Sequence, residues 1–254
     1  MKFIRYADGP RTGWALVEGP LARPLTQAPW LGVRPEGHLL PLDSLRLLAP
    51  AEPTKIVAVG KNYRDHALEM NEGIPENPIL FLKPTTALND PDGVIRRPRL
   101  SNRVDYEAEL AFVIGKTARR VKPEAAWDYI FGYTCLNDVT ARDIQKGDGQ
   151  WTRGKGFDGF APVGPWLVTD IDPSNLAVTA RLNGQVKQAS RTAQFMWPIP
   201  ELLAFITACM TLLPGDLVTT GTPAGIGPMK PGDVIEVEVE NIGILRNTVS
   251  EEYP

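Results

Sequence analysis

The stretch Asp105-Tyr106-Glu107-Ala108-Glu109-Leu110-Ala111-Phe112-Val113-Ile114 joins two closely spaced glutamates to an apolar run that is typical of a buried strand. Side chains two positions apart point to the same face of a strand, so Glu107 and Glu109 must share one small space. Two like charges on one face repel unless water, protons or a cation lies between them, and a cation neutralises a partly buried pair best. Asp138, about 30 residues further on, would supply a third carboxylate.

These carboxylates have two interpretations. From their spacing alone, Glu107 and Glu109 are explained equally well by an edge strand with solvated acids. Ala111 and Val113 continue the same face as apolar side chains, however, which places the acids at the mouth of a core, and the addition of Asp138 favours a functional site. Three carboxylates without a nearby cysteine or histidine suit Mg²⁺ or Mn²⁺ better than zinc. We therefore favour an Mg²⁺ or Mn²⁺ site.

Length and composition are those of an ordinary globular protein of 254 residues. A net charge of -3 with interspersed signs provides no basic patch for a phosphate backbone, which argues against nucleic acid as a partner. No run of about 18 apolar residues is present and no apolar signal segment follows Met1, so we expect no membrane span and a cytoplasmic protein. Cys135 and Cys209 both lie in apolar stretches, and we expect two buried thiols without a disulfide.

Proline and glycine divide the chain into short segments. The 24 prolines and 23 glycines, with few long helical patterns, favour a mainly β architecture. Paired prolines in residues 45–53 indicate a linker between a small N-terminal β module, residues 1–50, and a larger domain, residues 51–254. Strands are expected at residues 55–59, 79–82, 110–114, 166–168, 176–180 and 217–219, with a hairpin at 234–240 and 244–248. Helices that cover a sheet are expected at residues 123–130 and 200–210.

A histidine and a glutamate follow the predicted strand that ends at Gly60. If a short helical turn begins there, His66 and Glu69 lie at i, i+3 on one face and can form a hydrogen bond. A carboxylate that orients imidazole raises its basicity, as is required for activating water near neutral pH. An isolated histidine at such a junction is more often simply exposed, but the only other one, His38, lies in a Pro/Gly-rich stretch. We therefore favour His66 as a base, with the polar residues 71–78 as a candidate lid.

Two glycine-rich segments complete the set of candidates. Glycines flank Lys155, which would let the backbone approach a ligand while the ammonium reaches a carboxylate or enolate. A surface turn is the simpler interpretation of that segment. In residues 219–227 a strand end runs into a glycine-rich loop that offers N–H groups and a hydroxyl to an anion. This loop lacks the Gly-Lys-Ser/Thr ending of a nucleotide P-loop, so phosphate binding is not favoured.

Together these segments resemble the fumarylacetoacetate hydrolase family, in its bacterial branch with a short N-terminal module. The resemblance runs from about residue 55 to 249, and several independent motifs occur in the family's order. The segments that carry it are Val59-Gly60-Lys61-Asn62-Tyr63 with His66 and Glu69, residues 105–110, Gly132-Tyr133, residues 137–143 and 154–158, Gly164-Pro165-Trp166, Asn183-Gly184, Pro214-Gly215-Asp216 and residues 220–225.

The resemblance implies a mixed β-sandwich roll, usually paired as a homodimer, with a divalent metal and a histidine–glutamate dyad on a lid that closes over substrate. The implied metal ligands are Glu107, Glu109 and Asp138, the implied catalytic residues are His66, Glu69 and Lys155, and the implied substrate contacts are Thr222, Arg64 and Gln145. The metal would be Mg²⁺ or Mn²⁺, and Lys155 would help to hold an oxyanion.

The resemblance also implies a reaction on a 2-oxo acid or its enol. A metal that chelates the 1-carboxylate and 2-oxo group stabilises an enolate, and this serves C–C hydrolysis, decarboxylation or isomerisation. We predict an isomerase or decarboxylase of aromatic catabolism that acts on a 2-hydroxy-diene or 2-oxo dicarboxylate, such as 2-hydroxyhepta-2,4-diene-1,7-dioate. The alternatives are acylpyruvate or fumarylpyruvate hydrolysis and oxaloacetate decarboxylation or tautomerisation. The complete His66/Glu69 pair, together with Lys155, argues against a non-catalytic metal- or metabolite-binding module.

Overall fold

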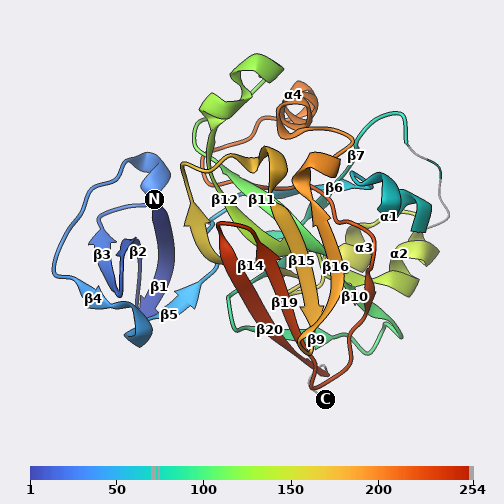
Figure 1. Ribbon diagram of the computed structural model, residues 1–254, viewed down its shortest axis with the longest axis horizontal. Coiled ribbons are helices and arrows are strands. Elements are labelled where there is room, and N and C mark those ends of the chain that lie inside the picture. Colours follow the sequence, from blue (N-terminus) through green and yellow to red (C-terminus); the bar gives the residue numbers. More distant parts are fainter. Residues whose placement is uncertain (70–72, 74, 252–254) are drawn as a thin grey trace.

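The computed structural model describes residues 1–69, 73 and 75–251, and it confirms a mainly β fold (Figure 1). The strands are β1 Lys2–Asp8, β2 Arg11–Glu18, β3 Leu21–Leu25, β4 Leu40–Pro41, β5 Arg46–Leu48, β6 Ile56–Gly60, β7 Ile79–Lys83, β8 Leu88–Asn89, β9 Val94–Arg97, β10 Val104–Tyr106, β11 Ala108–Ile114, β12 Ile130–Asn137, β13 Thr140–Ala141, β14 Ala161–Val168, β15 Ala177–Leu182, β16 Gln185–Arg191, β17 Leu217–Thr219, β18 Gly227–Pro228, β19 Val234–Val239 and β20 Gly243–Glu251. The strands expected from the sequence are present, including the β19–β20 hairpin.

Helices are short and lie around the sheets. The α-helices are α1 Arg64–Glu69, α2 Arg142–Asp148, α3 Thr152–Lys155 and α4 Ile199–Cys209, and the 3₁₀ helices are η1 Pro29–Leu31, η2 Leu42–Ser44, η3 Thr85–Ala87, η4 Pro123–Tyr129, η5 Pro173–Asn175 and η6 Thr192–Gln194. The helix expected at residues 200–210 is therefore α4, whereas the one expected at 123–130 is the 3₁₀ helix η4. None of the helices in the described part of the chain has the length and apolar character needed to span a membrane.

A large mixed sheet brings distant parts of the chain to one place. Its order is β4-β3-β2-β1-β14-β12-β11-β17-β6-β7, so β11 is an inner strand between β12 and β17. β11 is antiparallel to β12 and to β17, and β17 is parallel to β6. The start of β11 therefore lies beside the ends of β12, β17 and β6. These strand ends bring together Glu109, Asp138 and the residues that follow Gly60.

The second, five-stranded sheet has the order β16-β15-β19-β20-β9 and packs against one face of the large sheet (Figure 1). Phe112 of β11 packs in the same core cluster as Val178 of β15 and Val237 of β19. Ala111 and Val113 point to the opposite face and belong to another cluster. Both faces of β11 are thus buried, which explains the unbroken apolar run of its sequence.

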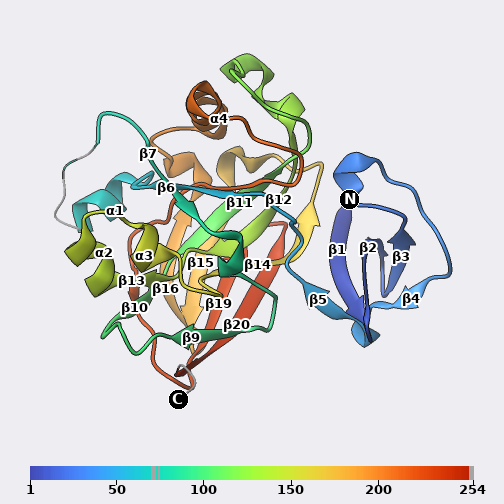
Figure 2. The ribbon, with the colours of Figure 1, turned by 180° about the vertical axis from the view of Figure 1, so that it is seen from behind.

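The N-terminal strands extend the large sheet at one side of the molecule (Figure 2). β1 pairs with β14 through Lys2 opposite Val168 and Phe3 opposite Leu167. Phe3 also packs in one cluster with Leu167, so the contact buries apolar side chains as well as pairing backbone groups. The division into residues 1–50 and 51–254 stays a prediction.

The expectation that both thiols are buried is wrong for Cys209. Cys135 is buried and Cys209 is exposed, and both thiols are free. The buried residues of α4 include Leu203, Ile206 and Thr207, whereas Cys209 is the last residue of the helix and lies outside that stripe. An apolar sequence context alone therefore did not predict its exposure.

Candidate metal centre and active site

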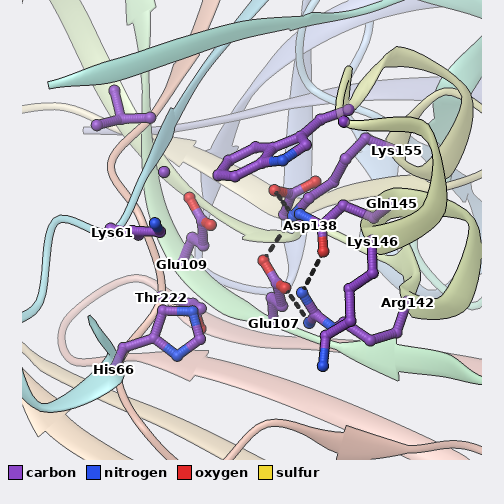
Figure 3. A pocket seen from close by; sticks show the side chains of 14 residues that line it. Lys61, His66, Glu107, Glu109, Asp138, Arg142, Gln145, Lys146, Lys155 and Thr222 are labelled. Atoms are coloured by element: carbon purple, nitrogen blue, oxygen red, sulfur yellow. Dashed lines mark hydrogen bonds and ion pairs between the residues drawn. The ribbon is translucent and has the colours of Figure 1, made fainter. Parts of the chain in front are cut away.

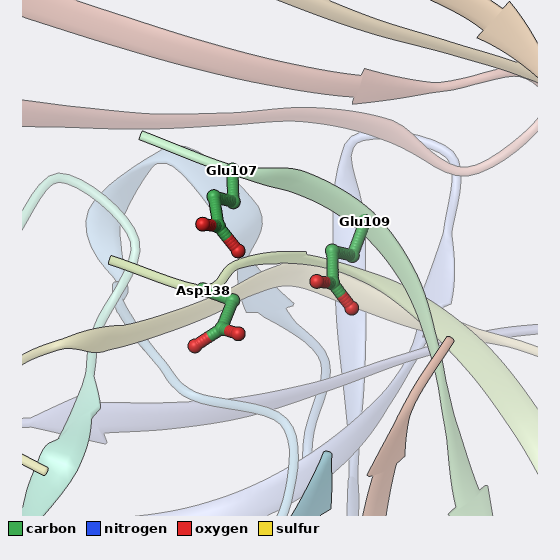
Figure 4. A group of neighbouring side chains, drawn as sticks. All are labelled: Glu107, Glu109 and Asp138. Carbon is green, nitrogen blue, oxygen red and sulfur yellow. The ribbon is translucent and has the colours of Figure 1, made fainter. Parts of the chain in front are cut away.

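The three acidic side chains predicted from the sequence lie together and are buried (Figure 4). Each of Glu107, Glu109 and Asp138 offers one ligand atom, and these atoms lie within 4.8 Å of one another. Glu107 is not part of a continuous strand, because it separates β10 from β11. Its N–H donates to Asn137 Oδ1 at 2.9 Å, and its carbonyl accepts from the Asp138 N–H at 2.9 Å. These bonds fix the third carboxylate beside the first two.

The charge on Glu109 is the least compensated of the three. Burial and the nearby charges of Asp138 and Glu107 raise the pKa of Glu109 well above its ordinary value. Its Oε2 accepts a hydrogen bond from the Gly221 N–H at 2.8 Å. A divalent cation would relieve the repulsion, and carboxylate oxygens are the ligands that hard cations prefer. The triad therefore fits a divalent metal ion.

Lys155 lies between two of these carboxylates. Its Nζ donates to Glu107 Oε2 at 2.7 Å and to Asp138 Oδ2 at 2.6 Å, and it lies 5.1 Å from the centre of the Phe81 ring. Burial opposes its charge, but Asp138 and Glu107 raise the pKa of Lys155 above its ordinary value. The ammonium is thus held in the centre of the site.

The glycine before Lys155 lies at a close helix contact that the sequence analysis did not predict. The segment forms the short helix α3 instead of a turn, and Lys155 is its last residue. A Cβ on Gly154 would lie 2.8 Å from the backbone of Gln145 in α2. Gly154 therefore permits the close approach of two helices. The approach of a ligand to this backbone stays a prediction.

Two further buried cations, Lys83 and Arg142, belong to this cluster and were missed in the sequence analysis. Lys83 is the last residue of β7, and its Nζ donates to Asp138 Oδ1 and to the carbonyl of Val139. Burial lowers the pKa of Lys83 in spite of the Asp138 charge. Its only sequence signal is a lysine directly after the apolar run of residues 79–82.

Arg142, the first residue of α2, connects several members of the site (Figure 3). It donates to Asp105 Oδ2 through Nε at 3.0 Å, to Glu107 Oε1 through Nη2, and to Gln145 Oε1 through Nη1 at 2.7 Å. Burial alone would raise the pKa of Glu107, but Lys155 and Arg142 hold it below its ordinary value. Glu107 and Glu109 therefore have opposite electrostatic surroundings.

His66 and Glu69 form the contact that their spacing predicts. Both lie on α1, and His66 Nδ1 lies 3.2 Å from Glu69 Oε2. The Gly225 N–H donates to both Glu69 oxygens, at 3.0 and 3.2 Å. The glycine-rich loop thus directs its N–H groups at Glu69 and, through Gly221, at Glu109, which are the protein's own carboxylates. The candidate lid at residues 71–78 lies partly outside the described residues.

Most of these side chains line a cavity of about 250 Å³. The lining comprises Val59, Gly60, Lys61, His66, Glu107, Glu109, Asp138, Arg142, Gln145, Lys146, Gly149, Trp151, Lys155 and Thr222. Thr222 Oγ1 donates to the Ala108 carbonyl at 3.0 Å and accepts from Gln188 Nε2 at 2.8 Å. Glu69 and Arg64 do not belong to the lining, and Arg64 is exposed on α1.

Comparison with known proteins identifies the family. The model described as fumarylacetoacetate (FAA) hydrolase C-terminal matches residues 55–250. The chain belongs to the fumarylacetoacetate hydrolase family. A second model, described as Rv2993c-like, N-terminal, matches residues 1–50.

Relatives of this fumarylacetoacetate hydrolase family member cover most or nearly all of the chain. Protein Rv2993c of Mycobacterium tuberculosis is 45% identical over 259 residues, which cover 98% of each chain. The mitochondrial oxaloacetate tautomerase fahd2 of Xenopus laevis is 44% identical over 225 residues, which cover 84% of this chain and 70% of the relative. The crystal structure of 2-hydroxyhepta-2,4-diene-1,7-dioate isomerase from Mycobacterium marinum has a TM-score of 0.93 and 44% identity and covers 100% of both chains. The chain is therefore an enzyme of this family.

Proposed function

We propose that the protein is an Mg²⁺- or Mn²⁺-dependent enzyme that isomerises or decarboxylates 2-hydroxy-diene or 2-oxo dicarboxylates in aromatic catabolism. The observation that carries this proposal is the buried triad of Glu107, Glu109 and Asp138, which shares one cavity with His66 and Lys155. The similarity to 2-hydroxyhepta-2,4-diene-1,7-dioate isomerase over the full chain supports the choice of substrate class.

The triad would hold the metal ion, which when bound supplies a Lewis acid for the 2-oxo group. Lys155 brings a positive charge to the same place and would stabilise negative charge that develops on a substrate oxygen. His66, oriented by Glu69 through Nδ1, has Nε2 to take up or return a proton. Gln145 and Thr222 both line the cavity. Gln145, whose Oε1 accepts from Arg142, would donate through Nε2 to a substrate carboxylate. The Thr222 hydroxyl already donates to the Ala108 carbonyl, so Thr222 would shape the wall beside the substrate.

Oxaloacetate tautomerisation is the second candidate, because a relative of that name is 44% identical. The reaction moves a proton between carbon and oxygen, so one base and one centre of positive charge suffice. His66 and the cluster around Lys155 offer both. Acylpyruvate hydrolysis would in addition require a water molecule held by His66 and Glu69.

A homodimer is part of the proposal. β7 is the last strand in the order of the large sheet, with β6 as its neighbour. Leu82 on β7 is 45% exposed, and covering an exposed edge strand is a common reason for pairing of chains. Light scattering after size-exclusion chromatography would measure the mass, and a mass of one chain at micromolar concentration would contradict this part.

The test is a substrate panel of dienedioates, oxaloacetate and acylpyruvates with Mg²⁺ or Mn²⁺. Absorbance change, carbon dioxide release and acid release are read separately, because they distinguish isomerisation, decarboxylation and hydrolysis. Glu107→Gln should abolish turnover of the active substrate, whereas the exposed control Glu124→Gln should not. Full activity of Glu107→Gln on every substrate would refute the metal mechanism.

His66→Ala separates an enzyme from a binding module. We expect it to lose turnover while Mg²⁺ binding, measured by calorimetry, is kept, because His66 pairs with Glu69, which is not one of the three carboxylates proposed as metal ligands. A non-catalytic module would retain its ligand binding and would have no turnover to lose.

A further inference from the structure

We propose that Lys146 binds the second carboxylate of a dicarboxylate substrate and thereby gives the cavity its preference for dicarboxylates over monocarboxylates. This inference rests on the proposed function in one respect, namely that the 2-oxo acid end of the substrate lies at the triad. Lys146 would then be a specificity-determining residue at the other end of the same ligand.

Charge pairing distinguishes Lys146 from the other cations of the cavity. Lys155 is bonded to Glu107 and Asp138, and Arg142 is bonded to acids and to Gln145. Lys61 also interacts with another group of the protein, so it is not free either. Within the described ranges, the side chain of Lys146 lines the cavity and has neither an ion pair nor a hydrogen bond. It is therefore the cation left for an anionic group from outside the protein.

The acids near Lys146 on its own helix already have partners. Asp143 accepts hydrogen bonds from the Ser101 hydroxyl and the Asn102 N–H. Asp148 pairs with Arg153 at 2.6 and 2.7 Å. Lys146 instead follows Arg142 by four residues, and like charges at this spacing destabilise a helix slightly. Because Arg142 is itself paired with acids, Lys146 is the residue of this helical face whose charge no acid in the described part of the chain neutralises.

The position of Lys146 suits the far end of a ligand. Arg142, Gln145 and Lys146 occupy one side of α2, and Lys146 lies about one turn, or about 6 Å, further along the helix than Arg142. Figure 3 shows Lys146 beside Arg142, with His66 and Lys61 on the other side of the view. A ligand that begins at the triad can therefore extend past Arg142 to Lys146.

The end of α2 leaves room for such a ligand. A Cβ on Gly147 or on Gly149 would meet no atom within 4 Å, and Gly149 belongs to the cavity lining. Trp151 contributes an indole ring to the lining, and this ring packs on Phe81 at 5.2 Å. The site thus combines an apolar surface for a carbon chain with a free ammonium for its terminal carboxylate.

The experiment compares two 2-oxo acids of equal length, 2-oxoadipate and 2-oxohexanoate, by calorimetry on the full chain with Mg²⁺. We expect the wild type to prefer 2-oxoadipate. Lys146 is exposed at the cavity, so Lys146→Gln should weaken the binding of 2-oxoadipate by about fivefold, the upper end for an exposed ion pair. The affinity for 2-oxohexanoate should stay within about twofold. Lys146→Arg should retain the preference, and the exposed control Lys122→Gln should bind as the wild type does.

The inference would be overturned if the wild type bound the two acids equally well or bound neither of them. It would also be overturned if Lys146→Gln bound 2-oxoadipate with unchanged affinity. Added salt should also reduce the wild-type preference, because the contact is electrostatic. Binding is measured without turnover. If the dicarboxylate preference depends on Lys146 but no dienedioate is converted, the proposed reaction fails while the inference about Lys146 stands.

Discussion

The substitution Glu109→Gln separates stability from metal binding. Glu109 is 1% exposed, and its ligand atom lies within 4.8 Å of those of Glu107 and Asp138. Glutamine fills the same volume and keeps an oxygen that can accept the Gly221 N–H, which now donates at 2.8 Å. The charge is therefore the main quantity that changes. We expect the metal-free protein to become more stable and the affinity for Mg²⁺ to fall.

The size of this effect follows from the spacing of the carboxylates. At 4.8 Å and an effective dielectric constant of about 20, each neighbouring carboxylate repels Glu109 by about 3 kcal/mol. Lys155 offsets part of the repulsion. The destabilisation by the Glu109 charge cannot exceed the free energy of protonating Glu109. For a carboxyl with an ordinary pKa of about 4.3, protonation at pH 7 costs about 4 kcal/mol. We therefore expect the free energy of unfolding of the metal-free variant to rise by about 2 kcal/mol.

Urea denaturation with EDTA and with Mg²⁺ measures both parts of the prediction. Mg²⁺ at about 100 times its Kd should stabilise the wild type by about 2.7 kcal/mol and the variant by much less, so the order of stability reverses. Because the pKa of Glu109 is raised in the folded protein, the advantage of glutamine should grow above about pH 4 and disappear below it. A metal-free variant less stable than the wild type, with the same gain from Mg²⁺, would refute the reasoning.

Three further substitutions test other parts of the structure. Lys83→Met leaves Asp138 with less positive charge, so the metal-free protein should lose about 3 kcal/mol in urea unfolding while its Mg²⁺ affinity rises in calorimetry. Gly60→Ala would bring a Cβ within 2.4 Å of the Trp151 ring, so we expect kcat/KM to fall about tenfold or more and tryptophan fluorescence to change. Burial opposes the charge of Asp216, but hydrogen bonds from its neighbours, including Lys55, hold its pKa below the ordinary value. Asp216→Asn should therefore lower the free energy of unfolding by about 2 kcal/mol at pH 7. This difference from the wild type should vanish as the pH falls through the folded-state pKa of Asp216. Urea titrations at several pH values would measure it.

The triad could be predicted because its signal is local. Two glutamates at a spacing of two residues precede an apolar run, and this pattern places them on one face wherever the strand lies in the sheet. The pairing of Ala108 with Asn137 then brings Asp138 to the same point. What the pattern did not predict is the interruption of the strand at Glu107, which depends on its contacts with Asn137 and Asp138.

The buried cations could not be predicted because their partners are distant in the sequence. Lys83 contacts Asp138, 55 residues later, and Arg142 contacts Glu107, 35 residues earlier. Locally, a lysine after an apolar strand is more often solvated, since lysine is almost never fully buried without a partner. The packing contact of Gly154 was likewise not predictable, because the Gln145 backbone that it approaches belongs to another helix.

The opposite surroundings of Glu107 and Glu109 determine how the site responds to a cation. The two residues are chemically identical and two positions apart, yet Lys155 and Arg142 compensate Glu107 while Glu109 faces mainly its carboxylate neighbours. Removing the charge of Glu107 would leave two buried cations short of a partner, which costs stability. Removing the charge of Glu109 relieves repulsion instead. Neutralising either glutamate should therefore weaken metal binding. In the metal-free protein, neutralising Glu107 should lower the free energy of unfolding, whereas neutralising Glu109 should raise it.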